Sequence, residues 1–203
     1  MKKDSIIISP SIASADSLHL ANELERIIAR DCKDVHIDIE DGNFVPNITF
    51  GKKTVNALRK ATNLPFSFHL MTTNWLEWLQ IAADTNAAVV FAHLEALDYP
   101  RAFIFGAKKL GLRAGLALNP KTPILHAEYL MPDLDAILIL TTEPDCVGEL
   151  FLNDMLKKAT YARALSPNLE IWVDGAVTFD ILASLKSSGV THAVMGREFF
   201  RKA

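Results

Sequence analysis

The fold is indicated first by one segment of eight residues, Val35-His36-Ile37-Asp38-Ile39-Glu40-Asp41-Gly42. Its first five residues alternate between strand-forming aliphatic residues and polar ones. Because successive side chains of a strand point to opposite faces, His36 and Asp38 share one face. In a parallel sheet that is covered on both faces, two such polar groups are costly to bury unless they are paired or bind a ligand. The question that the stretch raises is therefore which kind of sheet the chain builds.

The composition excludes several classes of protein. Half of the 203 residues are apolar and the formal net charge is -3, with no basic block of the kind that binds nucleic acid. The apolar runs are well short of the roughly 18–20 residues that a membrane span needs. Two cysteines, Cys32 and Cys146, make neither a disulfide framework nor a zinc motif, which favours the reducing cytoplasm. We expect one cytoplasmic domain over residues 1–203, with no nucleic-acid or membrane partner.

Strand-like and helix-like segments alternate along the whole chain. Short apolar runs predict strands at residues 5–9, 35–39, 66–71, 88–93, 112–118, 134–140, 169–174 and 190–195. Helical patterns follow them: one capped by Asp16 or Ser17, then 51–60, 75–84 after the cap Asn74, 100–110, a helix opened by Thr122-Pro123, 153–165, 178–188 after the cap Thr178, and a curtailed last helix from Arg197.

Eight strand–helix units with mostly continuous apolar strands favour an α/β fold of one particular kind. We predict a single-domain (β/α)8 TIM barrel with a shortened last helix. An open six-stranded sheet remains an alternative. Against it, no strand is followed by a glycine-rich dinucleotide turn, and Gly51-Lys52-Lys53-Thr54 lacks the spacing of a phosphate loop.

On a barrel, polar residues gather at the carboxyl ends of the strands, where barrel enzymes have their active sites. These residues are His36, Asp38, His69, His93, Asn119 and Asp174. Two histidines and two carboxylates form a mixed set of ligands that suits one divalent ion of Zn, Fe(II), Mn or Co. Such an ion beside two carboxylates suits proton transfer next to a carbonyl through an enediolate. His36 and Asp38 could instead be a structural pair, and His93 is predicted to support the site rather than to bind the ion.

Four motifs resemble the ribulose-phosphate 3-epimerase family. They are Ser11-Ile12-Ala13-Ser14-Ala15-Asp16, His36-Ile37-Asp38-Ile39-Glu40-Asp41-Gly42-Asn43-Phe44-Val45-Pro46-Asn47, His69-Leu70-Met71 and Val173-Asp174-Gly175. They occur in the family's order, and the resemblance covers nearly the whole chain. The second and third motifs are specific to the family.

The resemblance implies a role for each of these residues. His36, Asp38, His69 and Asp174 would bind the metal, and Asp38 and Asp174 would be the base and the acid on the two faces of C3. The substrate-binding residues would be Ser11, His69, Met71, Gly148, Gly175, Ala176, Gly196 and Arg197. Phosphate would bind backbone N–H groups at Gly175-Ala176 and Gly196-Arg197 beneath the loop after the sixth strand.

The chain also departs from the family around the substrate. Where the family has Asn-Pro-Gly-Phe-Gly-Gly-Gln, this chain has Glu143-Pro144-Asp145-Cys146-Val147-Gly148-Glu149. Glu40 replaces a methionine, Ala176 a glycine, and Arg197 a small residue. We therefore expect an isomerase that inverts C3 of a phosphorylated ketose, either ribulose 5-phosphate/xylulose 5-phosphate or a related sugar.

Two other functions are weighed against the epimerase. A barrel lyase acting on sugar phosphates usually has a lysine within its aspartate-rich strand motif, and Lys33 precedes the strand here. A non-catalytic or weakly active sugar-phosphate-binding barrel would not need a carboxylate on each face. The shortened last helix would leave apolar barrel wall uncovered, so we expect a homo-oligomer, a dimer or a hexamer.

Overall fold

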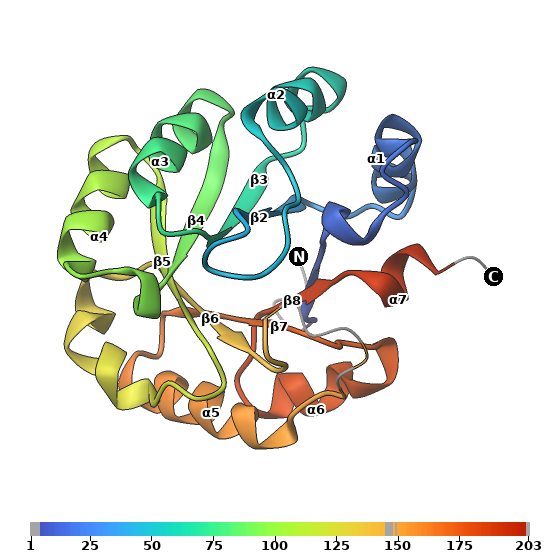
Figure 1. Cartoon of the computed structure of the whole chain (residues 1–203). Coiled ribbons are helices and arrows are strands. Elements are labelled where there is room, and N and C mark those ends of the chain that lie inside the picture. The colour runs from blue at the N-terminus through green and yellow to red at the C-terminus, as the bar shows by residue number, and fades with distance from the viewer. Residues whose placement is uncertain (1–4, 145–147, 149, 202–203) are drawn as a thin grey trace.

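A computed structural model describes residues 5–144, 148 and 150–201, and it has eight parallel strands arranged as a ring inside a ring of helices (Figure 1). The strands are β1 (Ile7–Pro10), β2 (Val35–Glu40), β3 (Phe66–Met71), β4 (Ala87–His93), β5 (Arg113–Leu118), β6 (Ala136–Leu140), β7 (Glu170–Asp174) and β8 (His192–Met195). They pair in the order β1-β8-β7-β6-β5-β4-β3-β2. This confirms the (β/α)8 barrel and excludes the open six-stranded sheet.

Most helices lie where the sequence predicts them. The α-helices are α1 (Leu20–Ala29), α2 (Lys52–Ala61), α3 (Trp75–Asp84), α4 (Pro100–Lys109), α5 (Leu156–Leu165), α6 (Leu182–Ser187) and α7 (Arg197–Phe200). The helix predicted after Thr122-Pro123 is a 3₁₀ helix, Ile124–Asp133, with Pro123 at its N-cap rather than inside its first turn. Pro132 within this segment cannot donate the backbone hydrogen bond that an α-helix requires. Within the described residues, no helix is long and apolar enough to cross a membrane.

Some of the predicted capping residues occupy N-cap positions and others do not. The predicted caps Asp16 and Ser17 lie before the start of α1, whose N-cap residue is His19; Asp16 accepts a hydrogen bond from the backbone N–H of Leu18 instead. Asn74 and Thr178 do occupy N-cap positions, but neither side chain makes a capping hydrogen bond. The side chain of Asn74 donates to Glu77. Packing against the barrel therefore fixes these helix starts more than capping does.

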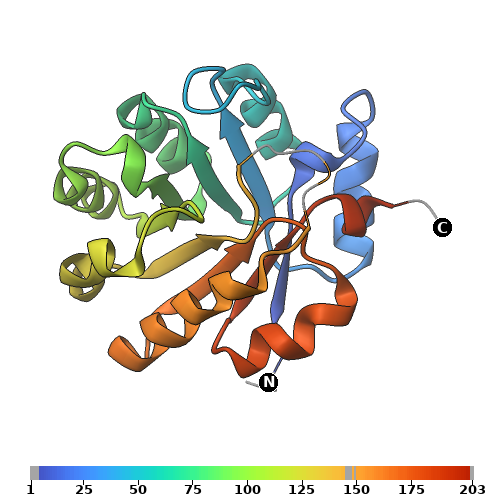
Figure 2. The same cartoon turned by 60° about the horizontal axis from the view of Figure 1, so that its bottom comes forward.

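The ring closes between β1 and β2, which lie side by side in Figure 2. A single backbone bridge joins Ser11 to His36 there, in contrast to the ladders that join the other neighbouring strands. Side chains complete the junction, because Ser9 donates to Asp34 and Ser11 donates to Asp38. The closure of the barrel thus depends on residues that adjoin the candidate site.

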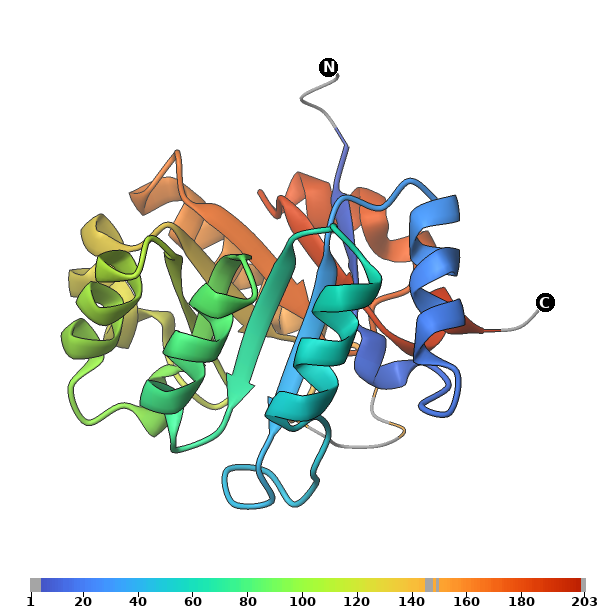
Figure 3. The ribbon, with the colours of Figure 1, turned by 90° about the horizontal axis from the view of Figure 1, so that it is seen from above.

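The interior of the ring has a polar and an apolar side. An apolar cluster fills the part bounded by β4 to β8: Val89, Phe91, Ala117, Ala136, Leu138, Leu140, Trp172 and Val194. The buried polar residues Ser9, His36, Asp38, Ser67 and His69 belong to β1, β2 and β3 on the other side, and two further buried histidines, His93 and His192, lie on β4 and β8. A larger apolar cluster packs the strands against the helices. The loop between β2 and α2 projects beyond the carboxyl ends of the strands, at the end where the polar side opens (Figure 3).

Gly115 tests the packing of the apolar side. It pairs with Phe91 across β4 and β5, and a methyl group added at Gly115 would lie 2.3 Å from the Phe91 ring. Gly115→Ala should therefore destabilise the protein by about 1–3 kcal/mol through overpacking. Phe91→Leu makes room, so the double variant should lose at least about 0.5 kcal/mol less than the sum of the two single losses. Urea denaturation of the four proteins measures this, and strictly additive losses would contradict the packing.

Candidate metal centre

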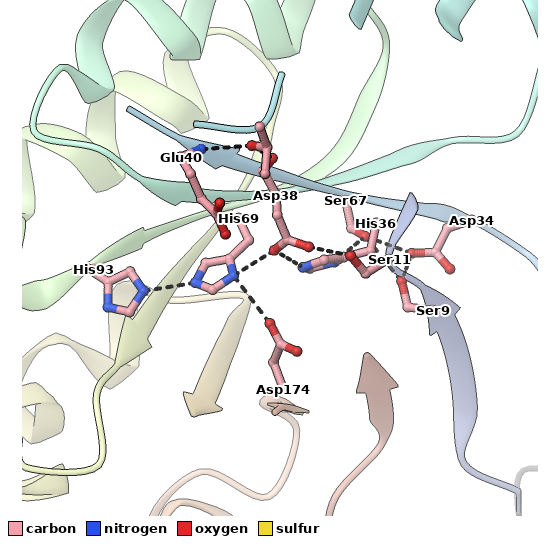
Figure 4. Close-up of polar contacts among 11 residues, drawn as sticks. Ser9, Ser11, Asp34, His36, Asp38, Glu40, Ser67, His69, His93 and Asp174 are labelled. Atoms are coloured by element: carbon pink, nitrogen blue, oxygen red, sulfur yellow. Dashed lines mark hydrogen bonds and ion pairs between the residues drawn. The ribbon is translucent and has the colours of Figure 1, made fainter. Parts of the chain in front are cut away.

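Four side chains from three strands converge at the carboxyl end of the barrel (Figure 4). His36 and Asp38 come from β2, His69 from β3 and Asp174 from the end of β7. One ligand atom of each lies within 4.8 Å of the others, and the four could hold a metal ion. Register explains the arrangement, because Asp38 pairs with His69 across β2 and β3. Asp174 reaches the same place from the facing side of the ring.

His69 is the centre of this cluster. Its Nδ1 atom lies 3.0 Å from Oδ1 of Asp38 and 3.3 Å from Oδ2 of Asp174. His69 is fully buried and Asp38 nearly so, whereas Asp174 is partly exposed. One ring nitrogen therefore faces both carboxylates, one from each side of the barrel.

His36 leaves one nitrogen without a hydrogen-bond partner. Its Nδ1 atom lies 2.9 Å from Oγ of Ser67, which in turn donates to Asp34 at 2.8 Å. Its Nε2 atom is buried, has no hydrogen-bond partner and lies 3.4 Å from Oδ1 of Asp38. Such an unsatisfied buried nitrogen is costly. Its position among one imidazole and two carboxylates fits a divalent ion with mixed nitrogen and oxygen ligands.

The electrostatics of the cluster favour a charged pair. Burial lowers the pKa of His69, but hydrogen bonds to Asp174 and Asp38 outweigh it and raise that pKa to about 9. Burial raises the pKa of Asp38, yet the neighbouring His36 and His69 hold it well below its usual range. The protein without metal thus has a protonated His69 beside an ionised Asp38 at neutral pH. A cation can replace that proton.

A cavity of about 750 Å³ opens beside the cluster. Its lining includes six of the eight residues that the sequence assigns to the substrate, Ser11, Met71, Gly175, Ala176, Gly196 and Arg197, together with Asp38 and Asp174 of the cluster. His36 and His69 lie buried behind this wall. Gly148 is exposed and is not among the lining residues. Asp145, Cys146, Val147 and Glu149 of the altered loop lie outside the described residues.

The backbone after β7 turns sharply toward the cavity. Gly175 has φ 115° and Ala176 has φ 50°, both in the left-handed region. A methyl group at Gly175 would lie 2.4 Å from Oγ1 of Thr142 and 2.7 Å from the Thr142 nitrogen, so only glycine fits. Ala176 adopts a conformation that disfavours every residue with a Cβ atom. Gly175 and Ala176 of this turn line the cavity.

Several residues of the site escape the sequence analysis. Asp34, Ser67 and Glu95 contact the two histidines or His93, directly or through one side chain. Glu40, which the sequence marks as a departure from the family, lines the cavity, and its side chain accepts a hydrogen bond from Asn47. Ser67 and Glu95 each lie two residues from a histidine that the sequence singles out. For Ser67, on β3 with His69, the available signal is the period-2 pattern of that strand. Glu95 follows β4 in the 3₁₀ helix Leu94–Ala96, where no strand pattern marks it.

Comparison with known proteins agrees with this geometry. Residues 7–200 match the ribulose-phosphate 3 epimerase family. The chain is 34% identical over 196 residues to a ribulose-phosphate 3-epimerase of Bacillus subtilis, an alignment that covers 94% of this chain and 90% of that protein. It is also 34% identical over 206 residues to the cytoplasmic isoform of that enzyme from Oryza sativa, with 97% and 88% covered.

The chain belongs to the ribulose-phosphate 3-epimerase family. The resemblance read from the four motifs is thereby confirmed, as is the assignment of the chain to the isomerases. Among solved structures, a tryptophan synthase α-subunit of Pyrococcus furiosus superposes with a TM-score of 0.70, covering 97% of this chain and 93% of that one. At 14% sequence identity this likeness supports the barrel fold alone.

The raised pKa of His69 predicts proton release when metal binds. At pH 7.5 Nδ1 of His69 carries a proton in the metal-free protein, since its pKa lies at about 9. An ion that binds this nitrogen must displace the proton, so affinity should rise up to about tenfold per pH unit below pH 9. Calorimetric titration with Mn²⁺ in buffers of different ionisation enthalpy measures the release. A binding enthalpy that is the same in every buffer would contradict it.

Proposed function

We propose that the protein is a metal-dependent epimerase that inverts C3 of a ketose phosphate, either ribulose 5-phosphate/xylulose 5-phosphate or a related sugar. The observation that carries the proposal is the approach of Asp38 and Asp174 to one atom, Nδ1 of His69, from strands on facing sides of the barrel. Inversion at carbon needs a proton removed from one face and another delivered to the opposite face. Two carboxylates that face each other across a site fit this requirement.

Asp38 and Asp174 act as the acid and base in this proposal. Asp38 stays ionised in its buried position because His36 and His69 adjoin it. It removes the C3 proton from one face, while Asp174, at the open cavity wall, supplies a proton to the other. In the reverse reaction the two roles exchange. Ser11, which donates a hydrogen bond to Asp38, fixes that carboxylate and borders the substrate cavity.

His36, Asp38, His69 and Asp174 would hold one divalent ion of Zn, Fe(II), Mn or Co. When bound, such an ion supplies positive charge that stabilises the enediolate formed when C3 loses its proton. The same charge favours the ionised form of Asp38, the base in this direction of the reaction.

In this proposal the phosphate group binds in the cavity beside Gly175, Ala176, Gly196 and Arg197. These residues follow β7 and β8 and line one cavity with the metal centre. Loops after the last two strands are a frequent phosphate site of this fold. Met71 also lines this cavity and is proposed to cover the metal centre, and Gly148 stays a predicted substrate-binding residue.

Solvent deuterium at C3 tests the two-base mechanism. Asp38→Asn and Asp174→Asn should each abolish epimerisation, because one face then has no proton carrier. Each variant should still exchange deuterium into the one epimer whose C3 proton faces the remaining carboxylate. Mass spectrometry or NMR of recovered substrate, started separately from each epimer, measures this. Asp133→Asn, which removes a partly exposed carboxylate that pairs with Arg101, is the matched control and should keep full activity.

Two results would contradict the assignment. If both variants epimerised normally, or both epimers exchanged equally in each variant, the carboxylates would not be separate bases. Metal analysis of the same samples shows whether a loss of exchange reflects loss of the ion. A wild-type protein that exchanges no deuterium with any ketose phosphate would instead favour the sugar-phosphate-binding barrel.

Location and assembly complete the proposal. The cytoplasm is proposed from the cysteine content, and one rice relative is named a cytoplasmic isoform. A homo-oligomer, dimer or hexamer, stays a prediction made from the sequence. Phe199 and Phe200 of α7 are buried, and Arg30 and Arg26 of α1 donate hydrogen bonds to their carbonyl oxygens.

A further inference from the structure

A second chain of buried polar groups starts on the far side of His69. Its Nε2 atom lies 2.8 Å from Nε2 of His93, on β4, and Nδ1 of His93 lies 3.1 Å from Oε2 of Glu95. His69 and His93 are both fully buried, and their ring centroids lie 4.9 Å apart. Phe44 packs on the other side of His93, at a centroid distance of 4.7 Å. Figure 4 shows His69 between the two carboxylates and His93.

Glu95 is held so that its carboxylate can only accept. Its Oε1 atom accepts a hydrogen bond from the backbone N–H of Asn119 at 2.9 Å and another from the hydroxyl of Thr122. Its Oε2 atom faces His93. These contacts tie the segment after β4 to the segment after β5, and they fix the carboxylate independently of the four residues of the metal centre.

The positions of the protons follow from these contacts. Because Glu95 only accepts, Nδ1 of His93 must donate to it. Two ring nitrogens 2.8 Å apart share one proton. A metal ion on Nδ1 of His69 leaves the ring proton of that residue on Nε2. His69 Nε2–H therefore donates to His93 Nε2, and His93 Nδ1–H donates to Glu95, without any unpaired donor or acceptor.

We propose that His93 and Glu95 are positioning residues that hold His69 with its Nδ1 lone pair turned toward the metal. The inference rests on the metal centre of the proposed function and adds residues outside its four ligands. Neither residue touches substrate or ion. They act through the orientation and tautomer of His69, as a carboxylate behind a metal-binding histidine commonly does.

The affinity for metal, measured without turnover, tests the hydrogen-bonded relay that His69, His93 and Glu95 form. His93→Phe keeps a ring and removes both nitrogens, so the Kd for Mn²⁺ should rise about 10–100-fold, the usual effect of removing such a partner. His93→Gln can place an acceptor opposite Nε2 of His69 and should recover part of the affinity. His192→Phe is the matched control, because His192 is another buried histidine, stacked on Trp172 within the ring, that does not contact the four ligands. Its Kd should equal that of the wild type.

An NMR measurement separates positioning from general packing. In the zinc-loaded protein, Nε2 of His69 should carry a proton whose signal is shifted downfield by the hydrogen bond to His93. This signal should move upfield in His93→Phe and remain in place in His192→Phe. Thermal melting of all variants reports their folding.

The outcomes separate the relay from the metal centre. A wild type that binds Mn²⁺ together with a His93→Phe variant that binds it equally well would overturn the relay and leave the metal centre intact. Equal weakening by His93→Phe and His192→Phe would also overturn it, since loss of packing alone would then be sufficient. A wild type that binds no Mn²⁺ would refute the metal centre, and with it the relay.

Discussion

The contact between the buried ring of His69 and the carboxylates of Asp38 and Asp174 is the constraint on which the rest of the site depends. A carboxylate and two imidazoles inside a barrel are costly to bury unless opposite charge compensates them. In the absence of metal, the proton on His69 provides part of that charge. It leaves Nε2 of His36 unsatisfied, however. A divalent ion would satisfy both conditions at once, which is why the protein's own electrostatics point to a metal centre.

The remainder of the barrel supports this arrangement through its uneven interior. Apolar side chains of β4 to β8 fill one side, and Phe91 takes the space that Gly115 leaves free. On the other side, each histidine of the cluster has a further partner behind it. Ser67 and Asp34 stand behind His36, and His93 and Glu95 stand behind His69. The closely packed apolar side thus fixes the positions of the strands that carry the polar side chains. Catalysis in the proposed mechanism depends on those positions.

The sequence predicts the four residues of the candidate metal centre better than the residues hydrogen-bonded behind them, for a physical reason. Alternation in β2 places His36 and Asp38 on one face from local sequence alone. His69 and Asp174 are predicted from their places near the carboxyl ends of strands, because the parallel strands of a barrel end at one mouth. Asp34 and Glu95 lie outside any alternating pattern of their own, and their role depends on which strands become neighbours. The sequence predicts a helix after Thr122-Pro123, but it does not predict that this helix, Ile124–Asp133, is of the 3₁₀ type with Pro123 at its N-cap. The substrate shell is the least predictable part, since its loops lack periodicity.

Anomalous diffraction from a crystal grown with zinc shows whether the four residues bind one ion. We expect one strong peak at the zinc edge between His36, Asp38, His69 and Asp174, with ligand distances of about 2.0–2.2 Å. Nδ1 of His69 and Nε2 of His36 should be the two nitrogen ligands, because these atoms face the carboxylates. The crystal is grown at a zinc concentration that saturates other zinc sites on the protein. If it shows no peak there and the four side chains point apart, the result contradicts the metal centre.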